Sequence, residues 1–396
     1  DALVMENIAA GRLRVSAELA GPVADADVVF IAVGTPSRRG DGHADLAHVY
    51  CAAEMIASAL RGFTVIVTKS TVPVGTGDEV ARIVAHTNPA ADMSVVSNPE
   101  FLREGAAVED FMRPDRIVLG VEDGRARAVM ERVYQPLHLN DEQILFTGRR
   151  TAEVIKYASN AFLAMKATFI NEISDLCEKV GGNVQEVSRG IGLDRRIGPQ
   201  YLEPGPGFGG SCLPKDTMAL LKIAQDHDVS LRLVEATVAA NEARKRAMGR
   251  RVIAACDGSV RGKTIALLGL AFKAGTDDMR DAPSLAIIQT LLDFGARVRV
   301  FDPVAMASAG TPISGVDFAR DAYAVARDAD CLVLVTAWNE FRSLDLARLR
   351  VSMRSARLVD LRNLYRAEKA ECAGFAYTGV GRGFAEQAWR QLDAAE

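Results

Sequence analysis

The sequence predicts an α/β fold in which two Rossmann-like, doubly wound domains are joined by a central helical domain. The first observation is that near-continuous apolar runs alternate with helical stretches at both ends of the chain, as in parallel sheets covered on both faces. The second is that the strand signal is absent from Thr151 to about Ala255, where helical periodicity dominates. The expected strands lie at 27–34, 63–68, 93–96, 116–120, 263–269, 296–302, 330–336 and 356–360.

These patterns place a first α/β domain at 1–146, a helical domain at 147–255 and a second α/β domain at 256–396. Residues 217–251 contain few helix breakers, so they form either one long helix or two helices that meet near residues 226–228. Such a helix is suited to act as a spacer and a dimer contact.

Composition excludes several classes of function. The 396 residues carry a net charge of −4, so no overall basic field favours nucleic acid. No apolar run approaches the roughly 18 residues of a membrane span, and the start has no signal-peptide pattern, so we expect a cytoplasmic protein without a membrane partner. Six widely spaced cysteines without a CxxC pair indicate a reducing compartment and no metal site.

The beginning of the sequence lacks an expected motif. A dinucleotide site starts with a strand and a G-x-G-x-x-G turn that opens a helix. The sequence instead opens at Asp1 in a helical pattern, and we therefore expect the first domain to be incomplete and the reading frame to continue upstream. Residues 205–210 do fit the pattern G-x-G-x-x-G. No strand precedes them and prolines flank them, so we interpret this segment as a glycine-rich bend.

Cys212 is the most informative single residue. It lies in this bend, before a possible helix start and close to Lys215, where a thiol can be reactive and accessible. The alternative is a buried structural cysteine, but a bend with four glycines is a poor place for a core residue.

Polar residues at four further places form candidate sites. Lys156 and Asn160 lie four apart on an apolar helix, suited to an oxyanion or a sugar hydroxyl, although a lysine and an amide at a helix surface would give the same pattern. The others follow predicted strands, at the edge where α/β sites form. They are the Val33–Pro36 segment, the Lys69–Thr76 segment with Thr71, and the Asn98–Gly105 segment with Glu100 and Glu104.

Five motifs together resemble the UDP-glucose/GDP-mannose dehydrogenase family over essentially the whole chain. They are Val-Gly-Thr-Pro-Ser at 33–37, Ser-Thr-Val-Pro-Val-Gly-Thr at 70–76, Asn-Pro-Glu-Phe-Leu-Arg-Glu-Gly at 98–105, Gly-Gly-Ser-Cys-Leu-Pro-Lys-Asp at 209–216 and Phe-Lys-Ala-Gly-Thr-Asp-Asp-Met-Arg at 272–280. The resemblance is stronger to the UDP-glucose members, especially at 33–46 and 148–164.

The resemblance implies a homodimeric enzyme that uses NAD to oxidise UDP-glucose to UDP-glucuronate through a thiohemiacetal and a thioester on Cys212. It implies that Lys156, Asn160 and Asp216 surround the reacting carbon, with Thr71 and Glu104 beside the nicotinamide and a water. The implied NAD contacts are Val33, Gly34, Thr35, Pro36, Thr71, Glu104 and Arg280. The implied substrate contacts are Glu100, Phe101, Leu102, Lys156, Asn160, Arg196 (which reaches the neighbouring subunit), Tyr201, Gly207, Phe208, Lys273 and Arg362.

Two alternatives stay open. Leu213 stands where UDP-glucose members usually carry Phe and GDP-mannose members carry Leu, so a GDP-mannose 6-dehydrogenase is one alternative. The other is a nucleotide-sugar-binding fragment without turnover, because half of the expected cofactor site is absent from the sequence.

Overall fold

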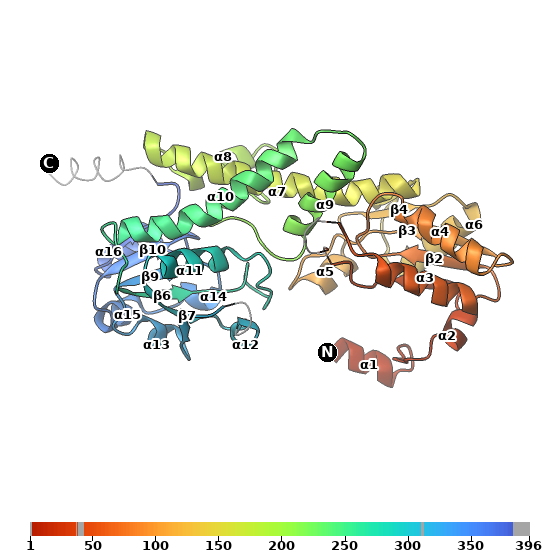
Figure 1. The fold of residues 1–396 in the computed structure, drawn as a ribbon, viewed down its shortest axis with the longest axis horizontal. Helices are drawn as coiled ribbons and strands as arrows, with labels where there is room; N and C mark the ends of the chain where they lie inside the picture. Colours follow the sequence, from red (N-terminus) through yellow and green to blue (C-terminus); the bar gives the residue numbers. More distant parts are fainter. Residues whose placement is uncertain (1, 37, 39–42, 310–312, 383–396) are drawn as a thin grey trace. The chain divides into compact units, whose positions relative to one another are not determined.

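The computed structural model describes residues 2–36, 38, 43–309 and 313–382 and divides into two compact units. Unit 1 comprises residues 1–103 and 107–157, and unit 2 comprises residues 104–106 and 158–396. The ribbon follows the chain from the N-terminus in red to the C-terminus in blue (Figure 1). The three predicted domain boundaries stay a prediction.

Unit 1 contains a five-stranded sheet in the order β1-β2-β3-β4-β5. The strands are β1 Val28–Ile31, β2 Thr64–Thr68, β3 Met93–Ser97, β4 Ile117–Gly120 and β5 Ile144–Thr147. All neighbours are parallel except β3 and β4, which meet antiparallel at Ser97 and Gly120. The predicted parallel sheet therefore contains one antiparallel pair, which the sequence does not reveal because a buried apolar run has the same composition in either direction.

Helices cover both faces of this sheet. Ile66 of β2 belongs to one apolar core with residues of the α3 and α4 helices, whereas its neighbours Val65 and Val67 belong to another core with residues of α6. This alternation explains why all five residues of β2 are buried. The helices of unit 1 are α1 Ala2–Ala9, α2 Ala20–Ala24, α3 Ala47–Ala59, α4 Thr76–Thr87, α5 Ala107–Met112, α6 Gly124–Tyr134, η1 Gln135–Leu137 and η2 Asp141–Gln143.

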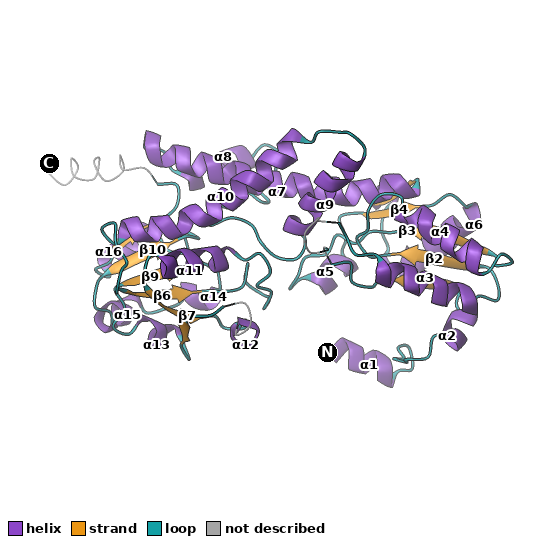
Figure 2. Ribbon diagram, in the orientation of Figure 1, coloured by secondary structure: helices purple, strands orange, loops and turns teal. Residues whose placement is uncertain are grey.

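The predicted helical region begins with α7, Arg149–Val180, which starts in unit 1 and continues in unit 2. It is followed by α8 Val184–Gly192, α9 Leu213–Asp226 and α10 Arg232–Ala255 (Figure 2). The two-helix alternative for residues 217–251 is correct, because α9 ends at Asp226 and Asp228 has a positive φ of 56°. No helix in the described ranges is long and apolar enough to cross a membrane.

Unit 2 also contains a wholly parallel six-stranded sheet in the order β11-β10-β9-β6-β7-β8. Counted from β6, this is the doubly wound order, in which ligands bind beyond the carboxyl ends of the strands where the order reverses, between β6 and β9. The strands are β6 Thr264–Leu268, β7 Arg297–Phe301, β8 Val316–Phe318, β9 Cys331–Leu334, β10 Arg357–Asp360 and β11 Ala376–Thr378. The helices are α11 Pro283–Asp293, α12 Met306–Ala309, α13 Ala322–Ala326, α14 Asn339–Arg342, α15 Leu346–Ser352 and α16 Ala367–Cys372.

Asp302 follows β7, where an acidic residue is expected in a nucleotide-binding half. Its carboxylate is fully buried and already accepts hydrogen bonds from the backbone N–H groups of Leu270 and Ala271, at 2.8 and 3.1 Å, and from Trp338 Nε1 at 3.0 Å. Asp302 therefore stabilises the turn after β6 with its own chain's donors.

Candidate active site

The glycine-rich bend places Cys212 at the beginning of a helix in unit 2. Cys212 is half-buried and is the residue directly before α9. Gly207 and Gly210 have positive φ values of 114° and 86°, and a Cβ on Gly209 would collide with the Asp281 carbonyl. The interpretation of residues 205–210 as a bend is confirmed, since no strand leads into it.

Two side chains of α10 hold this bend in place. Asn241 accepts a hydrogen bond from Phe208 N at 2.9 Å and donates one to Phe208 O at 3.1 Å. Arg244 donates to Gly205 O at 3.0 Å and also contacts Asn171 and Asp175. Both side chains are buried. The sequence analysis missed them because they lie more than 30 residues beyond the bend, on a helix whose pattern reveals nothing about its partners.

Polar groups surround Cys212 within unit 2. Ser211 Oγ lies 3.5 Å from the thiol sulfur. Asp216, one turn into α9, is buried, and its Oδ2 accepts a hydrogen bond of 2.6 Å from Asn160 Nδ2. Its other oxygen lies 2.9 Å from Lys215 Nζ but without hydrogen-bond geometry, so that pair is an ion pair only. The structure thus brings three predicted residues, Asn160, Cys212 and Asp216, into one unit.

Glu104 belongs to the same unit. Its carboxylate accepts a short hydrogen bond from Ser211 and a longer one of 3.4 Å from Thr276 Oγ1, and Arg280 Nη2 lies 3.7 Å away. Lys273, predicted to contact substrate, donates to the Glu104 carbonyl at 2.7 Å. Segment 273–280 therefore fixes Glu104 next to Ser211.

Arg362 lies where the second sheet is expected to bind a nucleotide. It follows β10, and its guanidinium donates to Val335 O at 2.8 Å, just after β9, and to Phe272 O at 3.0 Å, beyond β6. Burial lowers the pKa of Arg362 to about 10. A Cβ on Gly205 would lie 2.8 Å from Arg362 Nη1, so the guanidinium also adjoins the glycine-rich bend.

Two other predicted contacts lie on the segment before the bend. Arg196 is 89% exposed and pairs with Asp194 at 2.6 Å. Tyr201 has an unusual positive φ of 63°. An exposed guanidinium can reach another molecule.

The remaining predicted residues lie in unit 1. Lys156 is 3% exposed, and its ammonium forms an ion pair of 3.0 Å with Glu100. Lys156 Nζ also lies 5.5 Å from the ring centre of Phe101, and Arg116 Cζ lies 3.8 Å from the same ring centre. Glu100 additionally accepts a hydrogen bond of 2.6 Å from Leu102 N. Lys156 is thus a buried, paired cation, and its interpretation as a lysine at a solvated helix surface is wrong.

The loops after β1 and β2 are joined by their hydroxyl groups. Thr35 Oγ1 donates to Thr71 O at 2.8 Å, and Ser70 Oγ donates to Val33 O at 2.6 Å. Gly34, between them, has open space where a Cβ would be. Pro36 O accepts from Asp45 N, whereas Ser37 lies outside the described residues.

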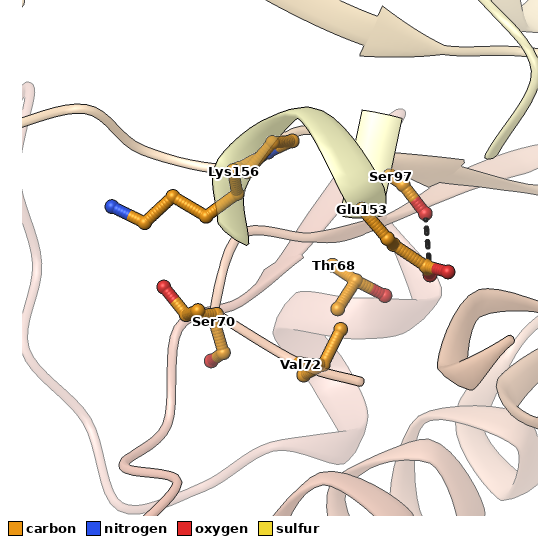
Figure 3. Close-up of a pocket in the computed structure, with 8 residues that line it drawn as sticks. Thr68, Ser70, Val72, Ser97, Glu153 and Lys156 are labelled. Atoms are coloured by element: carbon orange, nitrogen blue, oxygen red, sulfur yellow. Dashed lines mark hydrogen bonds between the residues drawn. The ribbon is translucent and has the colours of Figure 1, made fainter. Parts of the chain in front are cut away.

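A small pocket opens beside these loops and is lined by Thr68, Ser70, Thr71, Val72, Ser97, Pro99, Glu153 and Lys156 (Figure 3). In this view Glu153 points toward Ser97, while Lys156 extends on the side of Ser70. Glu153 is 3% exposed and accepts hydrogen bonds from Gly75 N, Gly77 N and Ser97 Oγ at 2.7, 2.9 and 3.0 Å. The buried Thr68 hydroxyl has no partner among the described residues. A polar ligand therefore suits this edge of the sheet.

Lys69 is a second inward-facing lysine at this edge, to which the sequence analysis assigned no role of its own. It donates to Asn98 Oδ1 at 3.1 Å and to Tyr134 OH at 3.3 Å. Its pKa is lowered from 10.5 to about 8, chiefly by burial and further by Lys156, while Glu100 opposes the shift. Between these two pKa values the unfolded chain binds more protons than the folded one, so stability increases with pH.

We expect replacement of Lys69 by Met to remove this dependence. Below pH 8 the buried charge of Lys69 lowers the free energy of unfolding of the wild type by roughly 3 kcal/mol, at 1.36 kcal/mol per pKa unit. This destabilisation disappears as the pH rises toward 10.5. Urea unfolding between pH 7 and 10 should show wild type gaining stability relative to Lys69→Met. Lys179→Met, at an exposed lysine of α7, is the control. Parallel curves for wild type and Lys69→Met would contradict the prediction.

Comparison with known proteins identifies the family. Three stretches of the chain match domain families of the UDP-glucose/GDP-mannose dehydrogenase family. Residues 1–138 match its NAD binding domain, residues 150–243 its central domain and residues 266–367 its UDP binding domain. The chain is 65% identical to a UDP-glucose 6-dehydrogenase of Rhizobium meliloti over 96% of this chain and 88% of that protein. It is 44% identical to a UDP-glucose 6-dehydrogenase of Pseudomonas aeruginosa, over 96% of this chain and 86% of that protein.

A solved UDP-glucose dehydrogenase from Pyrobaculum islandicum has the same architecture. It matches with a TM-score of 0.86 and 38% identity over 96% of this chain and 85% of that one. The fold of two nucleotide-binding α/β domains and a central helical domain is thereby confirmed. The chain belongs to the UDP-glucose/GDP-mannose dehydrogenase family and is an NAD-dependent oxidoreductase.

Proposed function

We propose that this protein oxidises UDP-glucose to UDP-glucuronate through intermediates bound to Cys212. The observation that carries the proposal is the half-buried thiol at the start of α9, next to the buried Asn160–Asp216 pair. The match to the family's UDP binding domain and the names of the two bacterial relatives support the substrate.

The chemistry follows from the need to retain an aldehyde between two oxidations. Cys212 Sγ adds to the aldehyde carbon and forms a thiohemiacetal, whose oxidation gives a thioester that water hydrolyses to the acid and the free thiol. Lys156 supplies a buried positive charge for the oxyanion. Asp216 orients or activates the water.

The residues at the carboxyl edge of the first sheet fit NAD. The unpartnered Thr68 hydroxyl, the Thr35–Thr71 link and the open space at Gly34 offer polar groups and close backbone to a polar ligand. We assign Val33, Gly34, Thr35, Pro36 and Thr71 in unit 1, and Glu104 and Arg280 in unit 2, to this cofactor. NAD, when bound, provides the hydride acceptor for each oxidation.

A direct assay tests the substrate and the reaction. The enzyme should form NADH with UDP-glucose and not with GDP-mannose, at two NADH per acid formed. Preference for GDP-mannose would favour the alternative suggested by Leu213. Calorimetry with NAD and UDP-glucose addresses the other alternative, since binding of the nucleotide sugar without turnover would identify a binding fragment.

We also propose a homodimer in which Arg196 reaches the substrate of the partner subunit. Its exposed guanidinium supports this assignment. Light scattering of the purified protein measures the assembly, and a monomer would remove the proposed role.

Lys273 and Arg362 are proposed to hold the uridine diphosphate end of the substrate. Such contacts form alike in the ground and transition states, so replacement of either by Ala should raise KM for UDP-glucose more than it lowers kcat. Charged hydrogen bonds are worth roughly 1.5 to 3 kcal/mol, which corresponds to about a ten- to hundredfold rise in KM.

Arg357→Ala is a matched control for Arg362→Ala. Arg357 lies on β10, the strand that Arg362 follows, and donates to the Ala255 carbonyl at 2.7 Å and to Asp257, so its loss tests the general cost of removing such a guanidinium. Unchanged KM values in both the Lys273 and Arg362 variants would contradict the assignment.

A further inference from the structure

Ser211 connects the proposed nucleophile to a carboxylate. Its hydroxyl donates a short hydrogen bond to Glu104 Oε1, and its oxygen lies 3.5 Å from Cys212 Sγ. A serine hydroxyl has one proton and two lone pairs. With the proton given to Glu104, a lone pair of Ser211 is available to accept the thiol proton. Thiol, hydroxyl and carboxylate therefore form a continuous path within unit 2.

The carboxylate end of this path is held firmly. Thr276 Oγ1 and Arg280 Nη2 lie 3.4 and 3.7 Å from the Glu104 carboxylate, and Lys273 binds its carbonyl. The next residue, Gly105, has a positive φ of 78°, and a Cβ there would lie 2.6 Å from the Gly275 carbonyl. These contacts fix the distance between Glu104 and Ser211.

Asp216, the other nearby carboxylate, is engaged elsewhere. One of its oxygens binds Asn160 and the other lies against Lys215. Its link to Cys212 runs through the backbone, where Asp216 N donates to Cys212 O at 2.8 Å. Among the described residues, Ser211 is the hydrogen-bond partner of the Cys212 thiol.

We propose that Ser211 and Glu104 form a proton relay that activates Cys212, an inference that rests on the proposed role of Cys212 as nucleophile. As the sulfur attacks the aldehyde carbon, the π pair of the carbonyl moves to its oxygen, Ser211 Oγ accepts the thiol proton, and Ser211 passes its own proton to Glu104 Oε1; with an alkylating agent the carbon loses its halide instead. The products are the new S–C bond, an unchanged serine and a neutral carboxyl group. A carboxylate is a much weaker base than a thiolate, with reference pKa values of about 4.3 and 8.5, so transfer accompanies the attack and does not leave a thiolate at rest.

Alkylation of Cys212 by iodoacetamide tests the relay without substrate or NAD. The rate is followed by mass spectrometry of the peptide that contains Cys212, in a background with the exposed Cys51 and Cys372 replaced by Ser. At low pH, where alkylation depends on the neutral thiol, wild type should react at a rate that no longer falls with pH, because the relay assists that form.

Ser211→Ala should lose this assisted rate. At pH 6.5 alkylation should be slower by about tenfold or more, whereas at pH 10, where the thiolate reacts unaided, the two proteins should agree within about twofold. Ser211→Thr should restore the low-pH rate. Glu104→Gln should lose the assisted rate at low pH to the same extent as Ser211→Ala. The variant that carries both substitutions should react no more slowly than either single variant.

Equal slowing of Ser211→Ala at both pH values would indicate a structural role and overturn the relay, as would no slowing at all. The charged groups near the thiol, Arg280, Lys215 and Asp216, are present in all variants. Failure of the proposed function would appear separately, as near-normal acid formation by Cys212→Ser, because alkylation needs no turnover.

Discussion

Replacement of Cys212 by serine is expected to abolish formation of the acid. A hydroxyl in place of the thiol removes covalent capture of the aldehyde, so the rate of acid formation should fall by about a thousandfold or more. Affinity for UDP-glucose should stay within a few-fold, because the sulfur acts on the reacting carbon and not in recognition of the nucleotide. Product analysis by chromatography and calorimetry of UDP-glucose binding measure the two quantities.

The matched control is Cys51→Ser, which changes an exposed cysteine of α3 and should leave both quantities unchanged. If Cys212→Ser produced acid at a near-normal rate, the assignment of the nucleophile would be wrong.

Replacement of Lys156 by Met is expected to have the second largest effect. The substitution keeps the length of the side chain but removes a buried ammonium that pairs with Glu100. Loss of a positioned charge that stabilises an oxyanion lowers kcat by about a hundred- to a thousandfold. KM should change much less, since the charge on the oxygen develops only in the transition state. Steady-state kinetics with UDP-glucose give both constants.

Lys222→Met serves as the comparison. Lys222 also lies on a helix and pairs with a carboxylate, Asp226, at 2.9 Å, but its pair is far more exposed. A drop in kcat of similar size in both variants would indicate a general cost of losing a paired lysine. Circular dichroism of Lys156→Met should remain that of the folded protein, because half-exposed Glu100 can be hydrated.

The buried strands could be predicted from the sequence, whereas the edge strands β5, β8 and β11 could not. β2 is buried at all five positions and therefore appears as a continuous apolar run. β5, β8 and β11 are three or four residues long and have few or no buried residues, so neither apolar run nor alternation marks them. The antiparallel direction of β4 relative to β3 could not be predicted either, since its composition fits both directions.

For the candidate site, individual residues could be predicted from the sequence, but their contacts with one another could not. Thr71 and Glu100 could be singled out because they follow strands, and Cys212 because glycines surround it, whereas Arg362 was implied by the resemblance to the family. The pairings of these residues depend on segments distant in the chain. Ser211 and Glu104 are separated by 107 positions, and Asn241 supports Phe208 from 33 positions away. Local sequence carries no information on such contacts, which arise only when the helices pack.

The buried Glu153 carboxylate has a consequence for where this protein can bind phosphate. The beginning of a helix attracts anions because its first backbone N–H groups have no partners. In α4 the N–H groups of Gly75 and Gly77 are already bound to Glu153. A phosphate brought there would have to displace the Glu153 carboxyl group. The protein thus fills this socket with its own side chain, and the N–H groups of Gly75 and Gly77 are not free to bind a diphosphate.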